Sequence, residues 1–278
     1  MGDALASLRR YSQGMPREKY THGHHESVLK SHTWRTIENS AAYLESRLQP
    51  GLSLLDVGCG PGTITVEFAD RLAPGRVVGL DASAEVIARA SAEFARPTLE
   101  FTVGDAYAMP FPDNTFDVVH AHQTLQHVAD PVAVLREMRR VARPGGVIAA
   151  RDVDYAGTFW FPLVPGLDEW LALYERVHRS NGGEPDAGRR LKAWARQAGF
   201  ETAESSASIW NFSDAADREW WGSMWEARIL ESAFAQDAVG KGFATQDELE
   251  RISRAWRAWA DDPDGVLMMP HGELIAIA

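Results

Sequence analysis

The segment LLDVGCGPGTIT, residues 54 to 65, places a short apolar run directly before a turn that contains three glycines. Such a run is typical of a strand in a parallel sheet whose two faces are both buried. Gly58, Gly60 and Gly62 allow a tight turn and a close approach of backbone N–H groups to a ligand, because glycine lacks a Cβ atom and tolerates positive φ. A helix is expected to begin at Thr63, with its first amides facing the same ligand. The segment therefore predicts a site for a small molecule that carries a nucleoside.

The spacing of the glycines helps to distinguish between possible nucleoside-containing ligands. A dinucleotide fingerprint requires its third glycine at the position that Thr63 occupies. Asp56 is expected to lie inside the turn, where a carboxylate would repel a pyrophosphate but would suit a cationic amino-acid group. An NAD-dependent oxidoreductase is therefore an alternative that shares the strand, the turn and the helix but predicts a glycine where Thr63 stands.

The residues around this turn resemble motif I of the class I S-adenosylmethionine-dependent methyltransferases, in the small-molecule branch related to ubiquinone and menaquinone biosynthesis methyltransferases. Three later segments extend the resemblance. The run RVVGL, residues 76 to 80, predicts a strand that ends in Asp81, roughly 20 residues beyond the glycines, where an acidic side chain can accept hydrogen bonds from ribose hydroxyls. Gly104-Asp105-Ala106 follows a predicted strand over 99–103 and resembles the adenine-edge motif. The phrase FDVVHAHQ, residues 116 to 123, resembles the FDxV motif, which borders the methionine part of the cofactor.

The resemblance implies S-adenosylmethionine as cofactor and S-adenosylhomocysteine as product. Asp56 and the glycine turn would hold the methionine end, Asp81 the ribose and Asp105 the adenine. Tyr20 lies in a segment that resembles a lid over the cofactor, where its ring would attract the sulfonium. The cofactor-binding residues implied in this way are Tyr20, Asp56, Gly58, Cys59, Gly60, Gly62, Thr63, Asp81, Ala82, Gly104, Asp105, Ala106, Ala121 and His122.

The alternation of strands and helices between about residues 52 and 152 predicts an α/β fold with a doubly wound parallel sheet. The resemblance implies a Rossmann-like seven-stranded sheet whose last strand is antiparallel, with a helical lid over the carboxyl ends of the strands. We expect an N-terminal helical lid segment over 1–50, the cofactor-binding core over 51–154, and the rest of the sheet with substrate-cap insertions over 155–278. Within the last part we expect helices over 166–180, 186–198, 214–237 and 245–260, a strand over 202–212, and a closing β-hairpin formed by 265–269 and 274–278.

The composition narrows the choice of partners and of cellular location. The net charge of −11 argues against a nucleic-acid partner, since binding phosphates requires a positive field. No run of 18 apolar residues occurs and the N-terminus lacks the apolar core of a signal peptide, so we expect a cytoplasmic protein without membrane insertion. Monomer and homodimer are both left open by the sequence. Cys59 is the only cysteine. No metal site is expected, because His22, His24 and His25 have no cysteine or paired carboxylate at ligand-like spacing.

Methyl transfer from a sulfonium is an in-line displacement, so the protein must chiefly align the reactants, and a general base helps only when the nucleophile carries a proton. His122 and His127 follow the predicted fourth strand and are the candidates for that base, whereas His120 is expected to be structural. Nine of the ten tryptophans follow the cofactor half. Most should be core, but Trp160 and Trp225 could line a pocket for a small aromatic or lipophilic acceptor. The acceptor atom could be C, O or N, in quinone methylation or in natural-product tailoring; a non-catalytic cofactor-binding protein is a further alternative.

Overall fold

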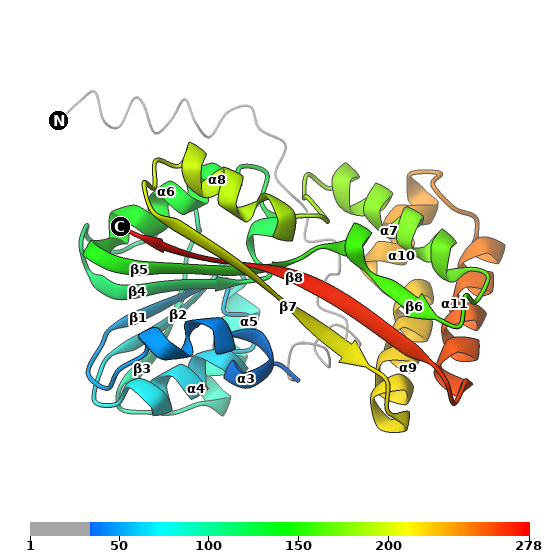
Figure 1. The fold of residues 1–278 in the computed structure, drawn as a ribbon, viewed down its shortest axis with the longest axis horizontal. Coiled ribbons are helices and arrows are strands. Elements are labelled where there is room, and N and C mark those ends of the chain that lie inside the picture. Colours follow the sequence, from blue (N-terminus) through cyan, green and yellow to red (C-terminus); the bar gives the residue numbers. More distant parts are fainter. Residues whose placement is uncertain (1–33) are drawn as a thin grey trace.

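Five parallel strands form the first part of the sheet in the computed structural model, which describes residues 34 to 278. They lie in the order β3-β2-β1-β4-β5 (Figure 1). The order reverses at β1, because the chain passes from β3 to the far side of β1, and ligands of open α/β sheets bind outside the carboxyl ends of the strands at such a point. The strands are β1 (Leu54–Val57), β2 (Val77–Asp81), β3 (Leu99–Val103), β4 (Phe116–His122) and β5 (Ala142–Val153).

Helices cover both faces of this parallel part, which confirms the doubly wound architecture (Figure 1). On one face, Phe68 of α4 and Leu44 of η1 are buried in the same apolar cluster. On the other face, Met138 of α6 and Ala195 of α8 share a second cluster. The bounds are α3 (Ile37–Ser40), η1 (Ala42–Arg47), α4 (Thr63–Leu72), α5 (Ala84–Glu93), η2 (Leu125–His127), α6 (Pro131–Val141), η4 (Gly188–Arg190) and α8 (Leu191–Gln197).

Three antiparallel strands complete the sheet, which has eight strands in the described part of the chain rather than seven. β8 (Val266–Ile277) pairs antiparallel with β5 and with β7 (Ala203–Phe212). The additional strand, β6 (Phe159–Phe161), pairs with the first residues of β8. The antiparallel strand predicted at the end of the chain is therefore present, and so is the strand predicted over 202–212.

The predicted C-terminal hairpin is wrong, because residues 266 to 277 form one continuous strand. Pro270-His271-Gly272 suggests a turn by composition, yet each residue has a reason to lie within a strand. The carbonyl of Pro270 accepts a hydrogen bond from Asp154 N at 2.9 Å. The nitrogen of Pro270 points to the same edge of β8, at a position where β5 has ended and β6 has not begun, so the N–H that proline lacks is not needed for strand pairing. Gly272 lies so close to the backbone of Gly188 that a Cβ atom would overlap it.

Four helices form a cap beside the carboxyl ends of β4 and β5 (Figure 1). The predicted helices are confirmed with small shifts, and the long excursion after residue 214 divides into two helices at Ser232. Their N-termini carry the signals that the sequence shows: Asp214 caps α9, and Thr245 with Glu248 forms a capping box at α11. The helices are α7 (Leu167–Ser180), α9 (Ala215–Glu231), α10 (Ala233–Gly240) and α11 (Gln246–Asp261), and η3 (Tyr155–Gly157) leads into this region.

Most of the tryptophans form the core of this cap, as predicted. Trp170 packs edge-on against Trp225 and Trp256, with ring centroids 4.8 and 4.7 Å apart. Trp225 is fully buried and Trp160 nearly so, and both belong to the same apolar cluster. The hypothesis that Trp160 and Trp225 line an acceptor pocket is therefore wrong, since the structure places them in the core.

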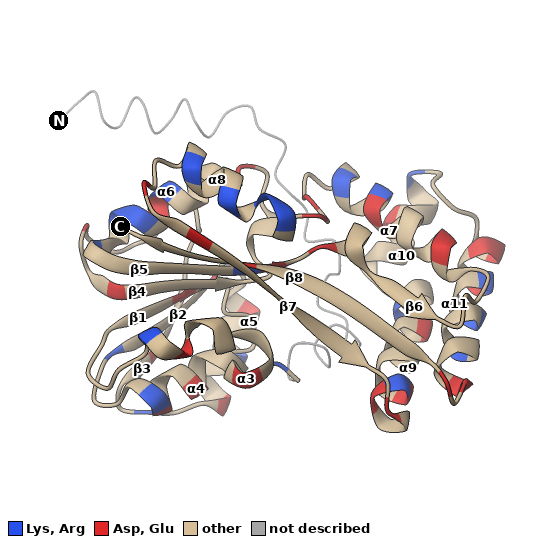
Figure 2. Ribbon diagram, in the orientation of Figure 1, with Lys and Arg blue, Asp and Glu red and all other residues tan. Residues whose placement is uncertain are grey.

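Charged side chains gather on the helices and are sparse along β7 and β8 (Figure 2). No helix between residues 34 and 278 is long and apolar enough to cross a membrane.

Candidate cofactor and acceptor site

The glycine turn joins β1 to α4 at the point where the strand order reverses. Gly58, Gly60 and Gly62 have φ values of 70°, 55° and 87°, in the region that side chains rarely adopt. A Cβ atom on Gly58 would collide with Thr124, and one on Gly62 would lie 2.7 Å from the Phe101 ring. The turn is thus packed between side chains of the neighbouring segments, and only glycine fits there.

Asp56 lies beneath the turn rather than at its surface, with 3% of its surface exposed. One carboxylate oxygen accepts a hydrogen bond from the Thr65 hydroxyl at 2.6 Å. The other lies 2.8 Å from Nδ1 of His120 on β4. Both carboxylate oxygens are therefore engaged within the protein, where they join β1 to α4 and to β4 beneath the turn. His120 has the structural place that the sequence predicts.

Asp81 and Asp105 lie at the ends of neighbouring strands. The Asp81 carboxylate accepts hydrogen bonds from Gly60 N at 3.1 Å and from Ser83 N at 2.9 Å, so it fixes the turn to the end of β2. Gly104 N donates to the Asp81 carbonyl at 3.0 Å, which brings the two segments side by side. The Asp105 carboxylate accepts from Tyr107 N at 2.9 Å and is exposed to solvent.

The remaining predicted cofactor residues surround these groups. Ala82 follows Asp81 directly, Thr63 opens α4, and Ala121 pairs with Val57 at the end of β1. Burial, with the carboxylates of Asp56 and Asp81, raises the pKa of the Cys59 thiol well above its usual value, so the side chain is a neutral thiol. Ala106 follows Asp105 and is half-buried. The prediction for Tyr20, like the one for His22, His24 and His25, lies outside the described residues.

These features fit an adenosine-bearing cofactor. The turn presents backbone without Cβ atoms, and the two carboxylates stand at adjacent strand ends where hydroxyl and amine donors can reach them. Among residues 34 to 278, no group of three or more His, Cys, Asp or Glu side chains gathers at a distance that could hold a metal ion.

His122 ends β4 and is buried. Its ring lies 5.8 Å from that of Trp210 and 6.3 Å from that of His271, with which it stacks. Neither ring nitrogen has a hydrogen-bond partner in the described part of the chain. Burial, followed by the charges of Arg35 and Arg151, holds the pKa of His122 well below its usual range. The imidazole is therefore neutral near pH 7, and its surroundings oppose its protonation.

A hydrogen-bonded chain that the sequence analysis missed lies beside His122. Arg35 donates to the Gln123 side-chain oxygen at 2.6 Å, and the Gln123 amide nitrogen lies 2.8 Å from Nε2 of His271. Since an amide nitrogen can only donate, Nε2 of His271 accepts, and Nδ1 donates to the Met269 carbonyl at 3.0 Å. Gln123 has a φ of 50°, a left-handed backbone conformation that the sequence does not predict.

His127 lies in a different environment. Its ring is 5.0 Å from that of His178 on α7, and its Nε2 is 3.2 Å from the Gln126 amide nitrogen. Burial, then the neighbouring His178, lowers the pKa of His127 well below its usual range.

Asp152 of β5 lies close to the same segment. Its carboxylate accepts a hydrogen bond from Gln126 N at 3.1 Å, and burial raises the pKa of Asp152 to about 7. The two candidate bases therefore have different neighbours, His122 at Trp210 and His127 at the helical cap.

Comparison with known proteins places this geometry among methyltransferases. A family model described as a methyltransferase domain matches residues 55 to 150. A Schizosaccharomyces pombe protein named as an uncharacterized methyltransferase is 35% identical over 268 residues, which cover 92% of this chain and 95% of that protein. The probable methyltransferase ltbC of Aspergillus luteorubrus is 31% identical over 278 residues, covering 92% and 96%. Demethylmenaquinone methyltransferase of Lactococcus lactis is 33% identical over 171 residues, covering 55% of this chain and 68% of the enzyme.

Solved structures share the fold at low sequence identity. The YcgJ protein of Bacillus subtilis superposes with a TM-score of 0.55 at 17% identity, covering 85% of this chain and 96% of that chain. An N-methyltransferase from Haemonchus contortus, solved with S-adenosylhomocysteine, gives a TM-score of 0.52 at 18% identity and covers 85% of this chain and 51% of that chain.

Proposed function

Since the chain belongs to the S-adenosylmethionine-dependent methyltransferases that act on small molecules, we propose that its acceptor is a small aromatic or lipophilic metabolite and that Asp81 and the glycine turn hold the cofactor. The observation that carries the proposal is the hydrogen bond from Gly60 N to the Asp81 carboxylate, because it joins the turn to the strand-end acid. S-adenosylmethionine, when bound, supplies a methyl group activated by a positively charged sulfur.

In this proposal, the residues around the turn bind different parts of the cofactor. The amides at the glycine turn and at the start of α4 would face the amino-acid end of the cofactor, with Asp56 fixing the turn from below. Asp81 would accept hydrogen bonds from the ribose hydroxyls. Asp105 and the Ala106 amide would recognise the adenine edge.

An acceptor would react near the carboxyl end of β4. His122 lies there next to Trp210 and remains the candidate base, since its unpaired ring nitrogens can accept a hydrogen bond from a hydroxyl or amine nucleophile, while burial and two arginines oppose full protonation of the ring. The aromatic surroundings support an aromatic or lipophilic acceptor. The similarity to a demethylmenaquinone methyltransferase supports a quinone-type acceptor in particular, over the part of the chain that this similarity covers.

Calorimetric titration with S-adenosylmethionine, S-adenosylhomocysteine and NAD tests the cofactor assignment. The wild-type protein should bind both adenosyl ligands and not NAD, and Asp81→Asn should weaken that binding by at least about tenfold, because the ribose hydroxyls lose a charged acceptor. Asp70→Asn is the matched control, since Asp70 is an exposed carboxylate on α4 that bonds only to Arg96 among the described residues. Binding of NAD, or equal adenosyl affinities in the two variants, would contradict the proposal.

A screen for methylated product tests the acceptor class. Quinols, phenols and indoles would be incubated with the protein and S-adenosylmethionine, and mass spectrometry would detect the gain of one methyl group. Protein that binds S-adenosylmethionine but methylates none of these classes would remove the aromatic or lipophilic acceptor while leaving the cofactor assignment intact.

A further inference from the structure

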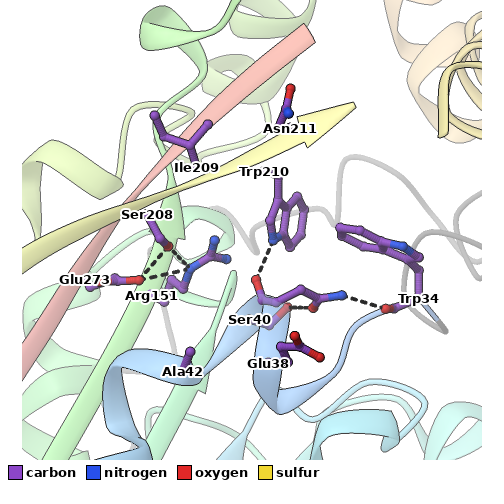
Figure 3. Close-up of a pocket in the computed structure, with 11 residues that line it drawn as sticks. Trp34, Glu38, Ser40, Ala42, Arg151, Ser208, Ile209, Trp210, Asn211 and Glu273 are labelled. Atoms are coloured by element: carbon purple, nitrogen blue, oxygen red, sulfur yellow. Dashed lines mark hydrogen bonds and ion pairs between the residues drawn. The ribbon is translucent and has the colours of Figure 1, made fainter. Parts of the chain in front are cut away.

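A cavity of about 270 Å³ lies between the first helical segment and the antiparallel strands (Figure 3). α3 and η1 form one wall, and β5, β7 and β8 form the other. The lining does not include the glycine turn or the ends of β2 and β3, so this cavity is distinct from the proposed cofactor site. Its volume is slightly below the usual range for ligand pockets, which suits a small molecule. The lining residues are Trp34, Glu38, Asn39, Ser40, Ala42, Arg151, Ser208, Ile209, Trp210, Asn211 and Glu273.

Arg151 forms the inner wall of the cavity and is only 1% exposed. It stands near the end of β5, opposite Glu273 of β8 in the antiparallel register. Its Nε donates to the Ser208 hydroxyl at 3.0 Å and lies 3.5 Å from the Glu273 carboxylate. Its two terminal nitrogens, Nη1 and Nη2, have no hydrogen-bond partner among residues 34 to 278. A buried guanidinium with two unpaired nitrogens is costly unless acceptors reach it.

The carboxylate of Glu273 does not fill that role. Its two oxygens accept hydrogen bonds from Ser208 at 2.5 Å and from Ser206 at 2.7 Å. Burial lowers the pKa of Arg151 to about 10, with Glu273 opposing the shift, so the guanidinium is charged at neutral pH. The forked end of Arg151 therefore keeps two buried, unpaired nitrogens at the wall of the cavity.

Most other polar side chains of the lining are already paired. Asn39 Oδ1 accepts from the Ser40 hydroxyl at 2.7 Å, and its amide donates to the Trp34 carbonyl at 2.9 Å. The Asn211 amide donates to the Ser213 hydroxyl at 3.2 Å. Glu38 carries the remaining carboxylate and is exposed to solvent, where water screens its charge. The donors left over are those of Arg151, so a ligand must bring acceptors.

Two tryptophans provide an aromatic wall beside the guanidinium. Trp210 lies 5.1 Å from the Arg151 guanidinium carbon, and its indole nitrogen donates to the Asn39 carbonyl at 2.6 Å, which fixes the ring (Figure 3). Trp34 meets Trp210 edge to face at 5.1 Å. We propose that this cavity binds a small aromatic carboxylate, with the carboxylate on Nη1 and Nη2 of Arg151 and the ring against Trp34 and Trp210. A planar carboxylate matches the fork of an arginine with two parallel hydrogen bonds.

The cavity shares Trp210 with the proposed acceptor region beside His122, but the test of this inference needs no activity. Indole-3-acetate is the probe, indole-3-acetamide is its neutral counterpart of the same shape, and calorimetric titration measures both. The wild-type protein should bind the carboxylate at least about tenfold more tightly than the amide, because the amide lacks the charge that pairs with Arg151. Saturating S-adenosylhomocysteine should leave this affinity unchanged, since the two sites are distinct.

Two variants identify the group responsible. Arg151→Gln combined with Glu273→Gln should abolish the preference for the carboxylate, and removing both charges avoids leaving Glu273 buried and unpaired. Arg254→Gln is the matched control, because it removes one positive charge from an exposed position on α11. Thermal unfolding of each variant verifies that it is folded.

Three results would each overturn the proposal: equal binding of the amide and the carboxylate, an unchanged preference in a folded double variant, or displacement of indole-3-acetate by S-adenosylhomocysteine.

Discussion

Asp56 and His120 face each other across two adjacent parallel strands, with a carboxylate oxygen 2.8 Å from Nδ1. They are directly opposite in the register of β1 and β4, and both side chains are almost completely buried. Thr65 of α4 binds the second carboxylate oxygen. Three elements therefore meet at the residue that precedes the glycine turn, and the position of the turn depends on this contact.

Replacing His120 tests that dependence. His120→Leu leaves one buried oxygen of Asp56 without its partner, so the free energy of unfolding should fall by about 1–3 kcal/mol and S-adenosylhomocysteine should bind more weakly. Urea denaturation and calorimetric titration measure the two effects. Glu100→Gln, which breaks an exposed ion pair with Arg76, should cost less than about 1 kcal/mol. A His120→Leu protein with unchanged stability would show that the contact does not hold the turn.

Replacing two glycines of positive φ by alanine distinguishes two causes of lost stability: the strained backbone conformation and the collision of the new Cβ atom with a neighbour. Gly62 and Gly145 have φ values of 87° and 78°. A Cβ atom at Gly145 meets nothing within 4 Å, whereas at Gly62 it would lie 2.7 Å from Phe101. Gly145→Ala should cost about 1 kcal/mol from conformation alone. Gly62→Ala should cost more and should also weaken cofactor binding.

Equilibrium unfolding of both variants measures the difference. Equal losses of stability would mean that Phe101 moves aside freely and that the packing around the turn is not restrictive.

The buried histidines make stability depend on pH. Burial, with Arg35 and Arg151, lowers the pKa of His122, and burial, with Arg151, lowers that of His271. The unfolded chain binds protons at these residues as the pH falls through about 6.5, while the folded protein does not. Stability from this source is therefore present above pH 6.5 and is lost on acidification. His122→Asn should reduce the loss between pH 7 and 5.5 by up to about 1.4 kcal/mol per pH unit.

Asp152 provides a control of opposite sign. Burial raises its pKa to about 7, so the folded protein holds a proton there that the unfolded chain releases near pH 4. Its contribution is complete below about pH 4 and is lost as the pH rises to about 7. Asp152→Asn should therefore gain stability relative to the wild type as the pH rises from 4 to 7. Urea denaturation at several pH values measures both variants, and a pH dependence unchanged by either would contradict the assignment.

The parallel half of the sheet could be predicted closely from the sequence. The first strands are short runs, of which β1 and β3 are followed by glycine and β2 ends in Asp81. Ser83 and Asp130 mark the helix starts by local chemistry. These signals depend on neighbours in sequence, which is why they can be recognised without a structure. The cap helices were predictable for the same reason, from their caps and apolar stripes.

The remaining features depend on contacts between distant segments. Gly272 belongs in a strand because Gly188 approaches it, and composition alone indicates a turn there. Gln123 and His271 were missed because their partners lie in other elements. Arg151 was also missed, although a charge that directly follows the apolar run 147–150 of a strand is a signal that could have found it. The placement of Trp34 beside Trp210 has no counterpart in the sequence pattern.

The core of the helical cap should contribute strongly to stability. Trp256 is fully buried and contacts Trp170, Trp225 and Trp259. Trp256→Ala should reduce the free energy of unfolding by about 3–5 kcal/mol, since it leaves a large cavity. Trp220→Ala, at a half-buried position, should cost clearly less. Calorimetric unfolding measures both, and equal losses would show that the cap tolerates the cavity by collapsing.

β8 runs without interruption from the cap to the far end of the sheet, and β7 accompanies it over ten paired residues. The first residues of β8 pair with β6 at the cap, and its last residues pair with β5 in the sheet. The two halves are therefore joined by a hydrogen-bonded ribbon and not by a flexible hinge. A chimera in which the cap is replaced by that of a relative must keep the register of β7 and β8. A shift of one residue would turn every side chain of these strands to the opposite face of the sheet.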